Sequence, residues 1–261
     1  MSKRIAVLVS GGGTNLQALI DAQSRGELGG GEIVAVISSK AGAYALERAK
    51  NAGIEGFVLP RKEFASNQAM TVALVDLLKK LDIDLVVLAG CMIIFTQELV
   101  DAYPNAIMNV HPALIPSFCG QGYYGLRVHE EALRYGVKVS GATVHFVSAE
   151  CDGGPIIAQR AVEVRHDDTP EMLQKRIMEQ AEWILLPEAV KLSGATVHFV
   201  TAECDGGPII AQEAVPVLPG DTPEVLQKRI MEQAEWKILP EAVSLFCQGR
   251  IKVDGRTVII Q

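Results

Sequence analysis

The chain has 261 residues, of which 49% are hydrophobic, and its formal net charge at pH 7 is −7. This acidic balance argues against a general nucleic-acid surface, and no apolar run reaches the roughly 18–20 residues that cross a membrane. The apolar part of the N-terminal segment MSKRIAVLVSGGG is too short for a signal peptide. The five cysteines include no Cys-x-x-Cys pair, so neither a disulfide framework nor a zinc ribbon is indicated. We therefore expect a cytoplasmic protein with a substantial core and no membrane or nucleic-acid partner.

The first half of the chain alternates short apolar strands with helices. Strands are expected at 4–10, 32–40, 56–60, 84–90 and 106–108, and helices within 11–26, 43–53, 67–81 and 96–103. Strands separated by helices of about ten residues are typical of a doubly wound α/β fold with a mostly parallel sheet.

A glycine turn at residues 11–13 leads from the first strand into the first helix, with Thr14 or Asn15 expected as the helix N-cap. Gly12 and Gly13 let the backbone approach a ligand, and the first helical N–H groups favour an anion. The turn lacks the G-x-G-x-x-G spacing, and the strand at 32–40 ends in Ser-Ser-Lys instead of an acidic residue. A phosphate site without a dinucleotide is therefore the favoured interpretation, and a tight turn that binds nothing is the alternative.

A second candidate site lies in the run AIMNVHPALIP at residues 106–116. Asn109 and His111 are two residues apart, so on an extended strand their side chains point to the same side. Both candidate sites follow parallel strands, whose carboxyl ends meet at the ligand-binding edge of such sheets. The alternative is that Asn109 caps a turn and His111 is a loop histidine with local partners.

Several motifs, in this order, resemble the folate-dependent formyltransferases: the glycine turn into Thr-Asn, LAG with Met92, NVHPALIPSF, GATVHFV and DGGPIIAQ. The resemblance covers nearly the whole chain. It implies a Rossmann-like formyltransferase fold, and transfer of a formyl group from 10-formyltetrahydrofolate to the amine of glycinamide ribonucleotide. Methionyl-tRNA formyltransferases and formyltetrahydrofolate deformylases share the Asn, His and Asp pattern and are alternatives. They match less well, because the former add a C-terminal barrel and the latter an N-terminal regulatory domain.

The resemblance also implies a role for each site residue. Asn109 would stabilise the oxyanion, His111 would move the proton, and the carboxylate of Asp152 or Asp205 would hold the imidazole and favour its charged form. The phosphate would lie on Gly12, Gly13, Thr14 and Asn15, a ribose hydroxyl on Glu182 or Glu235, and folate along Met92, Ile93, Ile94, Phe95 and Asn109. No metal is required, and we interpret His145 and His198 as core residues of strands.

Two positions depart from the family pattern on the folate side. Asn67 and Ile93 stand where the family commonly has arginines that contact the anionic folate tail. Losing such charge partners should weaken folate binding. A non-catalytic protein or an oligomer scaffold is therefore a further alternative.

The second half of the chain contains a repeat. Residues 140–192 recur at 193–245 with an offset of 53. The copies differ only at positions 148, 160, 163, 165, 166, 167, 172, 184, 185 and 191.

Each copy reads as a strand, an Asp-Gly-Gly turn, a second strand and a helix, followed after the second copy by a terminal hairpin at 246–261. We interpret the pattern as a duplicated strand-strand-helix unit within a single formyltransferase domain, with one copy surplus. Direct connection to the preceding helix favours the first copy. The turn glycine Gly220, which the first copy lacks, favours the second. We favour the second copy, with Asp205 and Glu235 as the functional residues, and expect the surplus copy to pack on the parent fold or to swap within a homodimer.

Overall fold

The computed structural model describes residues 3–190, 192–198, 209–216, 221–254 and 257–261. The chain divides into two compact units, Ser2–Val190 and Lys191–Gln261 with Met1. No helix within the described ranges is long and apolar enough to cross a membrane.

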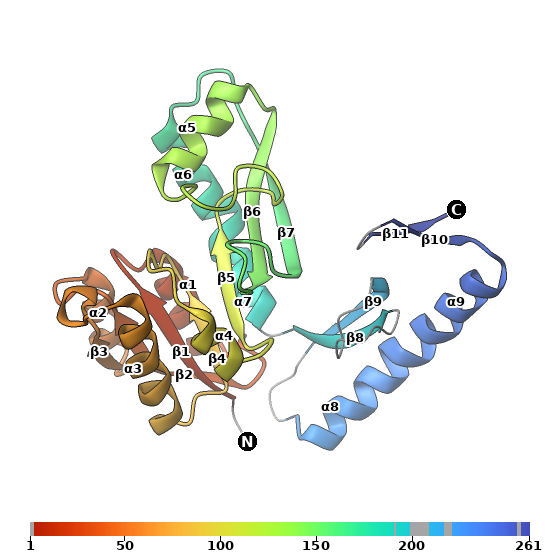
Figure 1. The fold of residues 1–261 in the computed structure, drawn as a ribbon, viewed down its shortest axis with the longest axis horizontal. Helices are drawn as coiled ribbons and strands as arrows, with labels where there is room; N and C mark the ends of the chain where they lie inside the picture. Colours follow the sequence, from red (N-terminus) through yellow and green to blue (C-terminus); the bar gives the residue numbers. More distant parts are fainter. Residues whose placement is uncertain (1–2, 191, 199–208, 217–220, 255–256) are drawn as a thin grey trace. The chain divides into compact units, whose positions relative to one another are not determined.

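The first unit is built on a seven-stranded sheet with the order β3-β2-β1-β4-β5-β6-β7 (Figure 1). Strands β1 to β5 run parallel, and β6 and β7 add antiparallel strands at one edge. The prediction of a doubly wound, mostly parallel sheet is confirmed. The strands are β1 (Lys3–Val9), β2 (Gly31–Ser38), β3 (Glu55–Val58), β4 (Leu85–Leu88), β5 (Ile107–His111), β6 (Val139–Phe146) and β7 (Ile156–Glu163).

Helices cover both faces of this sheet, and local signals place their ends. The Ser66 hydroxyl accepts a hydrogen bond from the backbone N–H of Ala69, and Thr169 caps its helix in the same way before Pro170. The helical segments are α1 (Thr14–Ser24), α2 (Tyr44–Asn51), η1 (Arg61–Glu63), α3 (Asn67–Lys80), α4 (Gln97–Ala102), α5 (Leu126–Tyr135), α6 (Pro170–Ile177), the π-helical turn η2 (Met178–Glu182) and α7 (Trp183–Val190).

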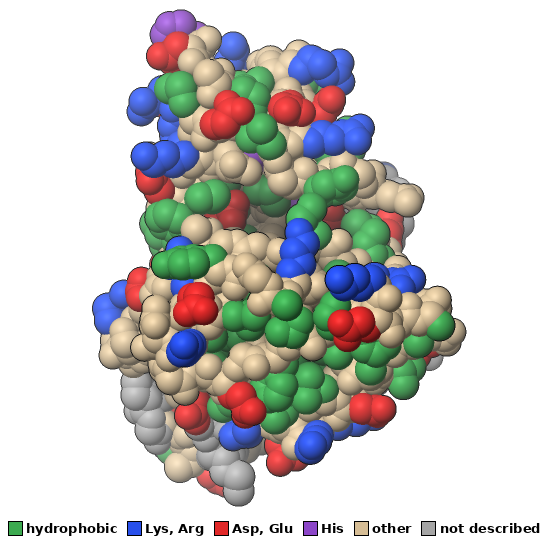
Figure 2. All heavy atoms as spheres, turned by 90° about the vertical axis from the view of Figure 1, so that its left-hand side faces the viewer, with side chains coloured by type: hydrophobic (Ala, Val, Ile, Leu, Met, Phe, Trp, Pro, Cys, Tyr) green, Lys and Arg blue, Asp and Glu red, His purple; other side chains and the backbone are tan. Residues whose placement is uncertain are grey.

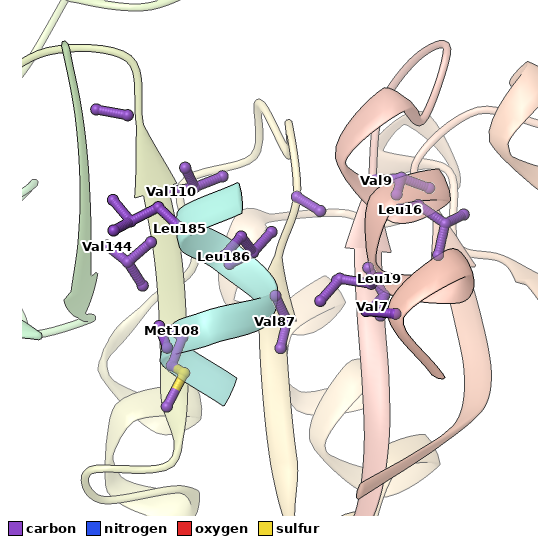
Figure 3. Packing of buried hydrophobic residues seen from close by; sticks show 14 of the residues in the cluster. Val7, Val9, Leu16, Leu19, Val87, Met108, Val110, Val144, Leu185 and Leu186 are labelled. Carbon is purple, nitrogen blue, oxygen red and sulfur yellow. The ribbon is translucent and has the colours of Figure 1, made fainter. Parts of the chain in front are cut away.

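The core has two layers because successive side chains of a strand point to opposite faces. Ile5, Val7 and Val9 of β1 join the layer beneath α1, α6 and α7, whereas Ala6 and Leu8 join the layer beneath α3 and α4. Figure 3 shows side chains of α7 beside those of the sheet in the first layer. Helix α7, the last helix of the first repeat copy, therefore belongs to the core.

The second unit repeats the same order of elements. Its hairpin β8–β9 has the register of β6–β7: Ser193 pairs with Val215 as Ser140 pairs with Val162. Its elements are β8 (Leu192–His198), β9 (Ile209–Pro216), α8 (Pro223–Ile230), the π-helical turn η3 (Met231–Glu235), α9 (Trp236–Cys247), and the antiparallel pair β10 (Ile251–Asp254) and β11 (Thr257–Ile260).

The first repeat copy occupies the sheet beside β5, whereas the sequence analysis favoured the second. Helix α5 leads into β6 through only three residues, so no long connection has to be closed. The turn before α6 also needs no glycine. The Asp168 carboxylate accepts the backbone N–H of Arg165 and pairs with the Arg176 guanidinium at 2.6 Å, and residues 165–168 have no positive φ.

Because of this arrangement, the equivalent leucines Leu186 and Leu239 should contribute differently to the free energy of unfolding. Leu186 is fully buried in the core of the first unit, whereas Leu239 is 53% exposed. Leu186→Ala should lower the free energy of unfolding by about 2–5 kcal/mol, and Leu239→Ala by less than about 0.5 kcal/mol. Chemical denaturation monitored by circular dichroism measures both. Equal losses for the two variants would contradict the placement of the first copy.

Candidate active site

The carboxyl end of β5 carries the centre of the site. Asn109 lies opposite His145 and His111 opposite Thr143 in the antiparallel pairing of β5 with β6. The turn between β6 and β7 brings Asp152 to the same place, with Oδ2 at 3.5 Å from His111 Nδ1 and Oδ1 at 3.6 Å from His145 Nε2. The four polar side chains of Asn109, His111, His145 and Asp152 thus converge from two strands and a turn.

His145 orients the amide of Asn109. Its Nδ1 is 2.9 Å from the carbonyl oxygen of Phe146, which can only accept a hydrogen bond, so Nδ1 carries a proton. Nε2 then accepts a hydrogen bond from Asn109 Nδ2 at 3.1 Å. One amide hydrogen of Asn109 is used in this bond, and the second is left to donate elsewhere.

His111 is held as a neutral imidazole. Its Nε2 is 2.9 Å from the carbonyl oxygen of Phe118 and donates to it, so the lone pair lies on Nδ1, towards Asp152. Burial lowers the pKa of His111 below its ordinary value, although the Asp152 carboxylate and the Phe118 carbonyl oppose the shift. The carboxylate favours the charged form, as expected, but desolvation outweighs it, so the ring can accept a proton.

Asp152 stays ionised in this half-buried position. Burial alone would raise its pKa, but the interactions with His145, with His111 and with the backbone N–H of Gly120 together lower it. That N–H donates to Oδ2 at 2.9 Å. The backbone of Asp152 has a positive φ of 54°, a conformation that aspartate tolerates better than most residues. The carboxylate can therefore stabilise a positive charge on His111.

The glycine turn lies at the carboxyl end of β1. Gly13, with a φ of 72°, precedes α1, and no side chain caps the helix, so the expected capping by Thr14 or Asn15 is absent. A Cβ on Gly13 would come within 2.6 Å of Ala45 Cβ, so only glycine fits. The Arg48 Nε donates to the carbonyl of Gly12 at 2.8 Å and fixes the turn. The first N–H groups of α1 are left without a side-chain acceptor, as an anion site requires.

A second buried contact joins the glycine turn to the repeat. Asn15 Nδ2 donates to Glu182 Oε2 at 2.6 Å. Both side chains are more than nine-tenths buried, and burial raises the pKa of Glu182. Glu182 ends the π-helical turn η2, a type of irregularity that is frequent at functional sites. Of the two predicted glutamates, the structure brings Glu182 to the site, whereas Glu235 is exposed in the second unit.

The stretch from Met92 to Phe95 follows β4 with alternating exposure. Met92 and Ile94 are exposed, whereas Ile93 and Phe95 line a small pocket together with residues of β1, β2 and α3. Asn67, at the start of α3, accepts a hydrogen bond from the Arg61 guanidinium. A guanidinium is therefore present beside Asn67, which sequence reasoning did not anticipate.

Sequence reasoning also missed His145, which it interpreted as a core residue. The residue is buried, as expected, but its ring meets Asn109 and Asp152. The register that sets it opposite Asn109 is visible only in the structure, so the sequence carried no signal for this role. Asp205 lies outside the described residues, as does the side chain of His198.

Within the described parts of the chain, no group of three or more His, Cys, Asp or Glu side chains could hold a metal ion. On the face drawn in Figure 2, basic and acidic side chains of the described residues are interspersed. That face thus presents no continuous basic stripe of the kind that follows a nucleic-acid backbone.

His129 of α5 is buried beside the site and has no hydrogen-bond partner on either ring nitrogen. Burial, with a smaller contribution from His111, lowers the pKa of His129 to about 4. The unfolded chain, with a histidine pKa of about 6.5, binds more protons below that pH than the folded chain does. Protonation therefore destabilises the fold as the pH falls from about 6.5 to about 4.

We predict that His129→Leu reduces this acid sensitivity. Between pH 7 and pH 4, the wild type should lose about 3 kcal/mol more unfolding free energy than the variant. Urea denaturation at each pH measures the difference. His166→Leu, at an exposed histidine, is the control and should follow the wild type. Parallel pH profiles for the wild type and His129→Leu would exclude this role.

Comparison with known proteins agrees with this geometry. The family model described as formyl transferase matches residues 3–190 and matches again at residues 186–243. The phosphoribosylglycinamide formyltransferase of Haemophilus influenzae is 43% identical over 189 residues, which cover 72% of this chain and 86% of that protein.

Two plant proteins of the same name, both described as chloroplastic, are longer. The Arabidopsis thaliana protein is 41% identical over 68% of this chain, and the Vigna unguiculata protein is 33% identical over 83%. The matches span 61% and 65% of these two relatives, less than two thirds of their length.

Solved structures show the same similarity. Glycinamide ribonucleotide transformylase 1 from Symbiobacterium toebii superposes with a TM-score of 0.69 at 35% identity, covering 99% of this chain and 94% of that one. The phosphoribosylglycinamide formyltransferase of Bacillus halodurans gives a TM-score of 0.67 at 40% identity, covering 72% of this chain and 93% of that one. With the family model matched over most of its length, this chain belongs to the formyl transferase family.

Proposed function

We propose that this protein transfers a formyl group from 10-formyltetrahydrofolate to the amine of glycinamide ribonucleotide, a step of purine synthesis, in the cytoplasm. The observation that carries the proposal is the convergence of Asn109, His111, His145 and Asp152 at the end of β5. The names of the relatives, at 33–43% identity, support this choice of substrates. A complete acyl-transfer site argues against a non-catalytic scaffold.

The amide of Asn109 stabilises the oxyanion in this mechanism. Attack of the substrate amine on the formyl carbon places negative charge on the formyl oxygen. Because one amide hydrogen of Asn109 is held by His145, the other is oriented to donate to that oxygen. Such a donor contributes about 3–4 kcal/mol to the stability of the transition state.

His111 removes the proton that the attacking amine loses. The proton arrives at Nδ1, the unprotonated nitrogen, and the imidazolium that forms lies 3.5 Å from the Asp152 carboxylate. The neutral folate nitrogen that leaves requires a proton, which His111 then returns. General acid–base catalysis of this kind typically contributes about 10²–10⁴ in rate.

The nucleotide is bound by the turn at the end of β1. Its phosphate accepts the free N–H groups at the start of α1, next to Gly12, Gly13 and Thr14. A ribose hydroxyl donates to Glu182, which Asn15 holds in place. The rigid Arg48 contact with Gly12 keeps this turn in one conformation.

The folate lies along Met92, Ile93, Ile94 and Phe95, and its anionic tail extends towards Asn67. The Arg61 guanidinium beside Asn67 supplies a positive charge for that tail. We retain the proposal that folate binding is weaker than in relatives with arginines at both positions, and Arg61 limits this weakening.

The repeat is best explained as an internal duplication of the C-terminal part of the formyltransferase fold. The second match of the family model, at residues 186–243, supports this origin. The first copy supplies Asp152 and Glu182 to the site, so the second copy is surplus to catalysis.

We predict that Asp152→Asn lowers kcat for formyl transfer at least about a hundredfold, because it removes the charge that stabilises the His111 imidazolium. Asp205→Asn, the matched change in the second copy, should leave kcat unchanged. His111→Ala and Asn109→Ala should each cost at least about a hundredfold. The measurement is formyl transfer to glycinamide ribonucleotide. Full activity in Asp152→Asn would contradict the assignment of the first copy, and full activity in His111→Ala would contradict the reaction.

We also predict a folate-specific effect at the start of α3. Arg61→Ala should raise KM for the formyl donor, and most for a polyglutamylated one, because a positive charge near the tail is lost. Installing arginine at both Asn67 and Ile93 should lower that KM. The KM for the nucleotide is the internal control, and a parallel change in both constants would argue against a local effect on folate.

A further inference from the structure

A short backbone segment, from Phe118 to Gly120, meets both members of the His111–Asp152 pair. The carbonyl oxygen of Phe118 accepts a hydrogen bond from His111 Nε2 at 2.9 Å. Two residues later, the backbone N–H of Gly120 donates to Asp152 Oδ2 at 2.9 Å. The first bond keeps the proton of the neutral imidazole on Nε2, and the second holds the carboxylate beside Nδ1. The conformation of this segment therefore determines which nitrogen of His111 is free to accept a proton.

The backbone of the segment is strained at Phe118. Its φ is 50°, in the left-handed region, where a residue as bulky as phenylalanine is an outlier. The φ of Gly120 is 87°, which glycine adopts without strain. A strained residue persists only where the surrounding structure compensates for its cost. Contacts made by Phe118 therefore have to offset this strain.

Two tyrosine rings pack on the ring of Phe118, which also lies against the core layer beneath α1, α6 and α7. Tyr135, the last residue of α5, meets it edge to face, with 6.0 Å between the ring centres and 73° between the ring planes. The ring of Tyr123 lies at 6.5 Å and is tilted by 56°. Aromatic pairs at such separations attract each other by more than their buried area accounts for. We call Phe118, Tyr123 and Tyr135 the aromatic cluster.

Helix α5 supports the aromatic cluster from both of its ends. Tyr135 closes the helix, and the guanidinium carbon of Arg127, in its first turn, lies 6.0 Å from the centre of the Tyr123 ring. Val128 and Ala132 anchor the helix, because both are fully buried. Tyr135 itself is 78% exposed. A substitution at this surface position should therefore leave the fold intact.

We propose that the aromatic cluster positions the general base of formyl transfer: the rings of Tyr123 and Tyr135 fix the Phe118 carbonyl and thereby the tautomer of His111. The inference rests on the proposed function, in which His111 accepts the amine proton at Nδ1. Without these ring contacts, Phe118 relaxes to a negative φ and its carbonyl turns away from Nε2. The imidazole proton then moves through solvent from Nε2 to Nδ1, where it is donated to the Asp152 carboxylate. The nitrogen that should accept the amine proton is then already protonated.

The tautomer of His111 can be read without any substrate, from the NMR chemical shifts of its two ring nitrogens in isotope-labelled full-length protein. In the wild type, Nε2 should carry the proton and Nδ1 should not. Tyr135→Leu should shift the population towards the form protonated on Nδ1. Tyr135→Phe keeps the ring and should give the wild-type spectrum. Glu130→Leu, at another exposed position of α5, is the control and should also match the wild type.

Formyl transfer supplies the second measurement. Tyr135→Leu should lower kcat about twofold to tenfold. The KM for the nucleotide and the KM for the formyl donor should stay unchanged, because the proton acceptor is affected and the binding of the two substrates is not. Circular dichroism checks the fold of the variant. Tyr123→Leu provides a second variant if Tyr135→Leu does not fold.

The two measurements together decide the positioning role of the aromatic cluster. A His111 spectrum in Tyr135→Leu that matches the wild type overturns this role, whatever the rate. A changed tautomer with unchanged kcat overturns it as well. A wild type that transfers no formyl group would refute the proposed function instead. The NMR comparison would then still decide whether the aromatic cluster sets the tautomer of His111.

Discussion

The antiparallel pairing of β5 with β6 is the interaction on which the site depends. Its register sets His145 opposite Asn109, and the turn that follows β6 carries Asp152 to His111. A shift of one residue would turn His145 to the other face of the sheet. Gly141 shows how closely β6 meets its other neighbour: a Cβ there would lie 2.1 Å from the carbonyl oxygen of Arg160 in β7. Backbone pairing thus fixes Asn109 and His145 opposite each other more rigidly than a loop could.

Burial and charge act in opposite directions within the site, and their balance determines the chemistry. A solvated histidine beside a carboxylate would be protonated over a wider pH range. At His111 desolvation outweighs the carboxylate, so the ring stays neutral while Asp152 stays ionised. The Asp152 carboxylate is too weak a partner to keep the resting imidazole of His111 protonated. It would nevertheless stabilise the imidazolium that forms when His111 accepts a proton. This difference between resting and reacting states suits the role of general base that we propose for His111.

The strand and helix pattern of the first unit was predictable, because apolar periodicity and glycine turns are local. The predicted placement of Asn109 and His111 on one side of a strand follows from the two-residue period alone. The role of His145 was not predictable in this way, since a histidine in an apolar strand looks the same whether its ring meets aliphatic side chains or an amide. The preference for Asp205 over Asp152 was wrong for a related reason. It relied on the glycine that the first copy lacks in the turn before its helix. In the structure, the Asp168 side chain stabilises that turn through hydrogen bonds with Arg165 and Arg176.

The two repeat copies distinguish the features that follow from local sequence from those that depend on neighbouring elements. Both copies form the same hairpin register, the same Thr-Pro helix start and the same π-helical turn. These features follow from local sequence, which the copies share. Burial of Leu186 and the Asn15–Glu182 hydrogen bond occur in one copy only, because they need α1 and the parent sheet. The surroundings of Glu182 are therefore set by its pair with Asn15. The same five residues, MEQAE, form a π-helical turn in the second copy as well, where Glu235 is exposed.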